Sequence, residues 1–250
     1  MLAGGRWLAR YLSQPIEIRG SAPPSDPLHL QHTLQAGDVL LVEGNTRVST
    51  AIKYLAQSTW SHAALCVGWP QPGDERPADH CLVEADTLEG VRTSSLERYA
   101  NLHTRICRPH GLNDEDRRAL VQAALAQVGH QYDLRNLVDL ARYLMPTPPV
   151  PTRWRRQLLT LGSGDPTRAI CSTLIARAFE SIRYPILPLR RREGSGSHDE
   201  GHLGLIRLRL FEPMHHSLVT PRDFDVSPYF DIIKPTLEAG FDPHDLEWRD

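Results

Sequence analysis

The chain has 250 residues, of which 40% are hydrophobic and 23% are charged, and its formal net charge is −2. These values predict one large globular domain with added segments and argue against a mainly disordered chain. The near-neutral balance gives no overall basic surface for nucleic acid. No stretch approaches the roughly 20 consecutive apolar residues that a membrane-spanning helix needs.

The first half of the chain predicts a sheet whose strands are joined by loops and one helix. Residues 1–34 show few periodic signals and are expected to form an N-terminal lead-in. After a turn at 35–38, apolar runs predict strands, and apolar residues at helical spacing predict a helix. The Pro- and charge-rich segment 70–79 predicts a surface loop. The expected strands lie at 39–42, 62–68, 81–85, 91–94 and 104–108, and the helix lies at 47–57.

Two further helices are predicted in the second half. Asn113 is a favourable N-cap for an alanine-rich helix that runs to Gly129. The second of these helices covers Ile170 to Ile182, where apolar residues share one face. The buried stripe of the first helix is expected to contain Leu120, Ala124 and Val128.

The segments around the last helix carry weaker signals. Residues 145–151 are rich in Pro and precede the basic cluster Arg153–Arg156, which predicts an insertion near 145–165. Residues 190–250 predict a flexible loop and a C-terminal wrap, with a strand around 206–210. Strands that cluster together, flanked by helices rather than alternating with them, favour an α+β fold around an antiparallel sheet.

The four cysteines are widely spaced and form no C-x-x-C pair. In a reducing compartment they are expected to be free thiols. Cys66, Cys81 and Cys107 lie in predicted strands, where a core role is expected. His62 and Cys66 are four residues apart in a strand, about 13 Å, which is too far for shared metal ligation. We therefore expect no metal site.

The fourth cysteine belongs to a candidate catalytic set. Cys171 lies at the start of the last predicted helix, where the partial positive charge favours a thiolate and N–H groups can hold an oxyanion. His62, at the start of a strand, is the candidate base, and Glu84 on the next strand is the candidate that orients its imidazole. Neighbouring strands lie about 5 Å apart, so this pairing is geometrically simple. Each residue alone also fits a structural role as core cysteine, structural histidine or surface carboxylate.

Four segments of the chain together resemble one enzyme family. They are LQAGDVLLVEGNTRVSTAIKYLAQSTWSHAALCVG, LVEADTLEGVRTSSLERY, VGHQYDLRNLVDL and AICSTLIARAFE. In this order they are similar to the circularly permuted NlpC-type papain-like hydrolases, the YiiX/YebB-like group. The resemblance covers roughly residues 35–185 and, more loosely, Thr220-Pro221-Arg222-Asp223. It implies a permuted papain-like catalytic domain at 35–189, with a central antiparallel sheet or half-barrel packed against helices.

The resemblance also implies roles for individual residues. Cys171 matches the nucleophile of the family, His62 its base and Glu84 its third polar residue. It implies a reaction without cofactor or metal. Tyr132 matches a tyrosine near the nucleophile, where it would help bind substrate or the oxyanion, although it also fits an aromatic plug beside a helix end. The residues expected to contact substrate are Tyr132, Ser61 and Ser172.

The implied function is cleavage of an amide bond in a peptide, including peptides of the cell-wall type. Other permuted papain-like relatives transfer or hydrolyse fatty acyl groups, and both reactions pass through a thioester at the cysteine. An acyl hydrolase or acyltransferase acting on lipid esters or amides therefore stays open. A third reading is a module that binds an amino acid or peptide without turnover, against which the intact Cys/His/Glu set argues.

The N-terminal segment and the basic clusters of the chain bear on its expected cellular compartment and binding partners. The N-terminus lacks the apolar core and cleavage site of a signal peptide, so the cytoplasm is the expected compartment. An amphipathic stretch from Arg6 to Leu12 and the cluster Arg153–Arg156 leave a peripheral membrane contact open, although the cluster also fits a solvated helix face. The expected partner is a small peptide or acyl substrate, with no nucleic acid. Nothing in the sequence indicates an oligomeric state.

Overall fold

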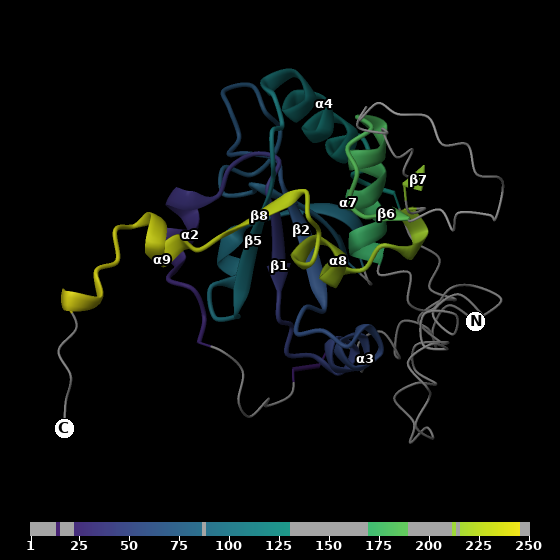
Figure 1. Cartoon of the computed structure of the whole chain (residues 1–250). Helices are drawn as coiled ribbons and strands as arrows, with labels where there is room; N and C mark the ends of the chain where they lie inside the picture. Colours follow the sequence, from purple (N-terminus) through teal and green to yellow (C-terminus); the bar gives the residue numbers. More distant parts are fainter. Residues whose placement is uncertain are drawn as a thin grey trace, which may run out of the picture.

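The computed structural model describes residues 14–15, 23–86, 89–130, 170–189, 212–213 and 216–245. Its centre is a six-stranded sheet in the order β4-β3-β2-β1-β5-β8, in which every neighbouring pair is antiparallel (Figure 1). The strands are β1 (Val39–Val42), β2 (His62–Cys66), β3 (Leu82–Asp86), β4 (Gly90–Ser94), β5 (Thr104–Pro109) and β8 (Phe230–Ile233). The expected α+β fold with a central antiparallel sheet is confirmed, and so are the five strands predicted before residue 110.

The helices and the remaining short elements surround this sheet. A second, two-stranded sheet joins β6 (Pro188–Leu189) and β7 (Glu212–Pro213). The predicted helix at 47–57 is confirmed as α3 (Arg47–Ala56), and that at 170–182 as α7 (Ile170–Ser181). The other helical elements are α2 (Pro27–Thr33), η1 (Leu96–Tyr99), α4 (Asp114–Leu125), η2 (His216–Leu218), α8 (Pro221–Asp225), α9 (Pro235–Glu238) and η3 (Pro243–Asp245).

Both faces of the sheet are buried, which explains why β1 reads as a continuous apolar run. Because side chains alternate along a strand, Val39 and Leu41 face one layer while Leu40 and Val42 face the other. The first face packs against α4 and α7, which contact each other and lie side by side in Figure 1. The second face packs against α2 and η1.

Helix α4 is shorter than the sequence predicts. It ends at Leu125 rather than near Gly129, and Val128 is 40% exposed instead of belonging to the buried stripe. Leu120 and Ala124 are fully buried as expected. The helix ends early because the following turn pairs with β4: the Gly129 N–H donates to the Val91 carbonyl at 2.8 Å, and Gly129 adopts a φ of +89° that favours glycine.

Two elements pack on the sheet from segments that the sequence placed outside the 35–189 domain. Helix α2 lies in the predicted lead-in; Asp26 caps it by accepting from two backbone N–H groups, and Leu30 on its inner face is 1% exposed. Strand β8 lies in the predicted wrap and extends the sheet beside β5. A seven-residue helix is too short to show a clear hydrophobic period, and the Phe-Asp-Ile-Ile sequence of β8 lacks the continuous apolar run of β1, so pattern alone did not separate them from loops.

Several predictions fall on residues outside the described ranges. These are the amphipathic stretch from Arg6 to Leu12, Tyr132, the cluster Arg153–Arg156 with its insertion at 145–165, the start of the flexible loop predicted from residue 190, and the strand around 206–210. In the part of the chain that the structure describes, none of the helices has the length and apolar character needed to cross a membrane.

Candidate active site

The candidate catalytic residues come from both faces of the sheet. His62 begins β2 and lies on the same face as Ala64 and Cys66, which pack toward α2. Cys171, the second residue of α7, belongs to the core on the opposite face. The two side chains are nevertheless in hydrogen-bond contact, because His62 occupies the end of its strand.

An opening in the sheet makes this contact possible. Strands β2 and β3 pair only at Leu65↔Val83 and Cys66↔Leu82, whereas β3 and β4 stay paired as far as Asp86↔Gly90. The start of β2 therefore diverges from the end of β3. Every second backbone N–H group of β2 points toward β3, and the N–H of Ala63 is one of them. Because β3 is no longer paired with β2 at this point, the Ala63 N–H donates to the Cys171 sulfur instead of to a β3 carbonyl.

His62 bridges the thiol and a carboxylate. Its Nε2 lies 2.7 Å from Glu84 Oε2, so Nδ1, on the other side of the ring, is the nitrogen that faces Cys171. Burial opposes the charge on the imidazole, but the neighbouring Cys171 and Glu84 outweigh it and raise the pKa of His62 to about 10. The His62 side chain stays 23% exposed, whereas Cys171 is 5% exposed.

Cys171 has the electrostatics of a nucleophile. Burial by itself raises the pKa of its thiol, yet the His62 charge and hydrogen bond, together with backbone hydrogen bonds from Ala63 and Ser172, lower the pKa below its ordinary value. The Ser172 N–H belongs to the first turn of α7, where N–H groups have no partner within the helix. The contact set therefore favours a thiolate paired with an imidazolium.

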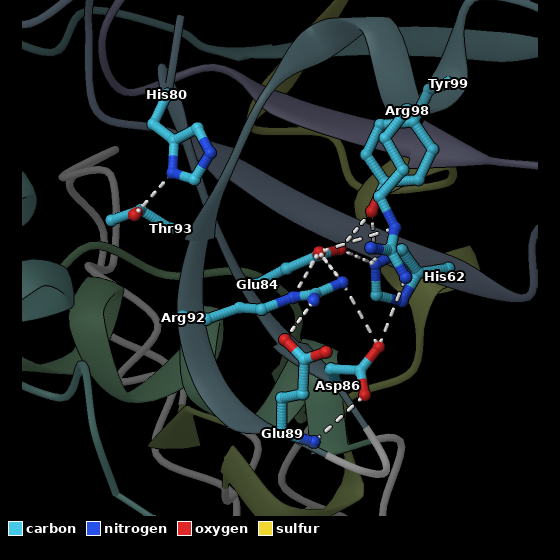
Figure 2. A network of polar contacts seen from close by, with 9 residues as sticks. All are labelled: His62, His80, Glu84, Asp86, Glu89, Arg92, Thr93, Arg98 and Tyr99. Atoms are coloured by element: carbon cyan, nitrogen blue, oxygen red, sulfur yellow. Dashed lines mark hydrogen bonds and ion pairs between the residues drawn. The ribbon is translucent and has the colours of Figure 1, made fainter. Parts of the chain in front are cut away.

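Glu84 is held on both of its carboxylate oxygens. Besides His62, Oε2 accepts from the Tyr99 hydroxyl, and Oε1 accepts from Arg92 Nε at 3.1 Å (Figure 2). Arg98 Nε lies 3.8 Å from Oε1. Although Glu84 is only 2% exposed and burial raises its pKa, these donors lower the pKa well below its usual range. Glu84 is thus ionised inside the protein.

The comparison with known families fits this geometry. Residues 33–143 match the family model described as permuted papain-like amidase enzyme, YaeF/YiiX, C92 family. No curated protein sequence matches the chain. The match includes His62 and Glu84 but ends before Cys171, so the resemblance to permuted papain-like enzymes is confirmed over residues 33–143, while the role of Cys171 rests on the contacts described above.

Two of the three predicted substrate contacts have structural partners. Ser61 Oγ accepts from the Gly44 N–H at 3.0 Å; a Cβ at position 44 would lie 2.8 Å from it, so glycine is required there. Ser172 Oγ donates to the Val219 carbonyl at 2.6 Å. Both serines are buried, and their role toward substrate stays a prediction, as does that of Tyr132, which lies outside the described residues.

The hydrogen bond from Ser172 connects the C-terminal segment of the chain to the first turn of α7. Immediately after Val219, a capping box begins α8: Asp223 Oδ2 accepts from the Thr220 N–H at 2.8 Å and from its hydroxyl at 2.9 Å. This is the Thr-Pro-Arg-Asp segment of the looser resemblance. The segment therefore supports the position of the helix that carries Cys171.

The other three cysteines are core residues, as expected. Cys66, Cys81 and Cys107 are free, buried thiols. Burial raises the pKa of Cys81 to about 11 and raises the pKa of the other two further. Among the residues that the structure describes, no group of His, Cys, Asp or Glu gathers in a way that holds a metal ion.

Sequence reasoning missed Tyr99 and Arg92. Arg92 had a detectable signal: a hairpin with its turn before Gly90 sets Glu84 opposite Arg92, and both interrupt apolar neighbours. Tyr99 had none, because it lies on a four-residue 3₁₀ helix whose packing only the structure shows. Figure 2 also contains His80, whose Nδ1 lies 2.8 Å from Thr93 Oγ1, but this pair is separate from the contacts of Glu84.

Proposed function

We propose that this chain is a cysteine hydrolase that cleaves an amide bond in a peptide substrate, including peptides of the cell-wall type, through a thioester on Cys171. One observation carries the proposal: the Cys171 thiol is in contact with His62, and His62 is in contact with the buried carboxylate of Glu84. The nucleophile therefore contacts the base, and the base contacts the acceptor that orients it. The match to an amidase family favours an amide over an ester as the scissile bond.

Acylation begins with a thiolate–imidazolium pair. The Cys171 thiolate attacks the substrate carbonyl carbon and forms a C–S bond, while the carbonyl electron pair moves to oxygen. N–H groups at the start of α7 stabilise this oxyanion. When the oxyanion collapses, the C–N bond breaks, and His62 donates its Nδ1 proton to the leaving amine.

Deacylation reverses the role of His62. The imidazole, now neutral, takes a proton from water on Nδ1 as the water oxygen attacks the thioester carbonyl. The C–S bond then breaks, which releases the carboxylic acid and restores the thiolate–imidazolium pair. Throughout both steps, Glu84 holds Nε2–H and stabilises the imidazolium.

The direct test replaces the nucleophile. Cys171→Ala is expected to reduce turnover of a peptide amide by at least about 10⁴-fold while the fold stays intact, because removal of a nucleophile abolishes the covalent route. Cys107→Ala is the matched control: it removes another buried thiol, far from His62 in sequence and in the middle of β5, and should leave turnover unchanged. Turnover and circular dichroism are measured for both variants.

The substrate panel separates the alternatives. Peptide amides and fatty acyl esters are supplied to the wild type, and intact mass reports any acyl adduct. Turnover of amides supports the proposal, whereas turnover confined to acyl esters would replace it by a lipid acyl hydrolase. Tight binding of a peptide with no adduct and no product in the wild type would instead indicate a non-catalytic binding module. Full activity in Cys171→Ala would contradict the assignment of the nucleophile.

A further inference from the structure

The hydroxyl of Tyr99 lies where His62 and Glu84 meet. It donates to Glu84 Oε2, the same oxygen that faces His62, and its oxygen lies 3.0 Å from His62 Nε2 (Figure 2). The Tyr99 ring is 5.9 Å from the imidazole ring, measured between centroids. The three polar groups thus form a closed triangle of hydrogen bonds.

The position of this hydroxyl is fixed by packing. Tyr99 is 5% exposed and belongs to the core between the sheet and α2. Leu96, at the other end of η1, is 7% exposed and anchors the same short helix in that core. Arg92 meanwhile occupies Oε1 of Glu84, so the carboxylate cannot rotate without losing donors on both oxygens.

The triangle has consequences for the protons of His62. The one hydrogen of the Tyr99 hydroxyl is committed to the carboxylate, so only oxygen lone pairs face His62 Nε2. An Nε2 without its proton would point a lone pair at these acceptors and would be unsatisfied. Neutral His62 therefore carries its proton on Nε2 and leaves Nδ1 free to act as a base.

We propose that Tyr99 is a positioning residue that holds neutral His62 in the Nε2–H tautomer, and that it thereby serves the deacylation step of the proposed hydrolase. The inference rests on the proposed function, because it assigns Tyr99 to the step in which neutral His62 must accept a proton from water on Nδ1. During acylation His62 begins as an imidazolium, in which both nitrogens carry protons. Loss of the hydroxyl therefore affects the second step more than the first.

The test compares the two steps in Tyr99→Phe. A p-nitrophenyl ester gives a burst for acylation and a steady state for deacylation. We expect the burst rate to stay within about twofold of the wild type, and the steady-state rate to fall about tenfold, since a slightly misplaced base costs one to two orders of magnitude. Acyl-enzyme should accumulate in intact-mass spectra.

A matched control removes a different tyrosine hydroxyl. Tyr184 follows α7 and donates to the Tyr229 carbonyl at 2.6 Å, away from His62. Tyr184→Phe should lower the melting temperature but keep the wild-type ratio of burst to steady-state rate. An unchanged ratio in Tyr99→Phe would overturn the inference, and Tyr99 would be a packing residue. If Cys171→Ala itself showed a burst, the proposed function would fail instead, so the two failures are distinguishable.

A second measurement does not depend on the folding of Tyr99→Phe. In ¹⁵N-histidine spectra of Cys171→Ala, which keeps Tyr99 and Glu84, His62 is titrated to its neutral form. The inference predicts a protonated Nε2 and a bare Nδ1. A neutral His62 with its proton on Nδ1 would contradict it.

Discussion

Cys107 and Cys171 are both buried thiols in one core, yet their environments have opposite effects on ionisation. Burial raises the pKa of Cys107, the charge of Asp225 raises it further, and the opposing charge of Arg105 does not outweigh them. At Cys171 burial acts in the same direction, but His62 and two backbone donors reverse the result. The ionisation of a thiol in this core therefore depends on the groups that face the sulfur, and not on how exposed the sulfur is.

The sheet itself creates this difference. Cys107 lies in β5 between two strands and pairs with Val39 on one side and Ile232 on the other. Backbone N–H groups around it are used by these ladders. Cys171 approaches the sheet where the ladder between β2 and β3 has ended, so the Ala63 N–H is available to the sulfur. The end of a ladder of hydrogen bonds thus distinguishes the core cysteine from the proposed nucleophile.

Replacement of His62 should have the largest effect on the difference in pKa between Cys171 and Cys107, because His62 is the main cause of the lowered pKa of Cys171. In His62→Ala the pKa of Cys171 loses its main cause of lowering and moves toward the raised values of the other thiols. Each unit of increase removes about nine tenths of the thiolate at neutral pH. Alkylation of Cys171 by iodoacetamide should slow by about 100-fold, as followed by intact mass.

The outcome that would contradict this prediction is equally definite. Wild-type alkylation of Cys171 in His62→Ala, with the circular dichroism spectrum unchanged, would mean that the helix start alone produces the thiolate. His103→Ala is a suitable control, because His103 pairs with Glu43 through Nδ1 at 3.2 Å and none of its described contacts involves Cys171.

Replacement of Glu84 should have a smaller effect and a characteristic pH dependence. Glu84 raises the pKa of His62, so in Glu84→Gln that pKa falls below its wild-type value of about 10. The imidazolium is then lost at lower pH, and the alkaline decline of kcat/KM should move down by about one pH unit. The rate at neutral pH should fall about 10- to 100-fold, since the imidazole is less well oriented.

A second histidine–carboxylate pair provides the control for Glu84. Glu180, on the exposed side of α7 toward its C-terminal end, accepts from His216 Nδ1 at 2.8 Å. Glu180→Gln removes such a pair about 13 Å along the helix from Cys171. Its pH profile should match the wild type. An unshifted alkaline limb in Glu84→Gln would mean that another group orients His62.

The sequence predicts those parts of the fold that have a strong hydrophobic pattern. The predictions of the five strands before residue 110 and of the helix that carries Cys171 were correct. Their buried apolar residues form continuous runs in the strands or recur at helical spacing in the helix. The predicted end of α4 was wrong, because the hydrogen bond between Gly129 and Val91 is a long-range contact that no local sequence pattern reveals. Helix α2 was missed because it is short, and strand β8 because a charged residue interrupts its apolar residues.

The candidate site shows the same division. Chain order and resemblance selected His62, Glu84 and Cys171, and the structure brings these three together. The opening between β2 and β3 could not be predicted from the sequence, because it depends on the residue at which the hydrogen bonds between the two strands end. Tyr99 was likewise hidden, since its hydroxyl reaches Glu84 only through the packing of η1.

The most direct test of the central claim is the rate of alkylation at each of the four cysteines of the wild type, measured by peptide mass mapping from pH 5 to pH 10. Cys171 should react rapidly at pH values well below 9, where an ordinary thiol is protonated, while Cys66, Cys81 and Cys107 stay unlabelled in the folded protein. Equal, slow labelling of all four, rising only above pH 9, would contradict the claim that His62 and the open ladder activate Cys171.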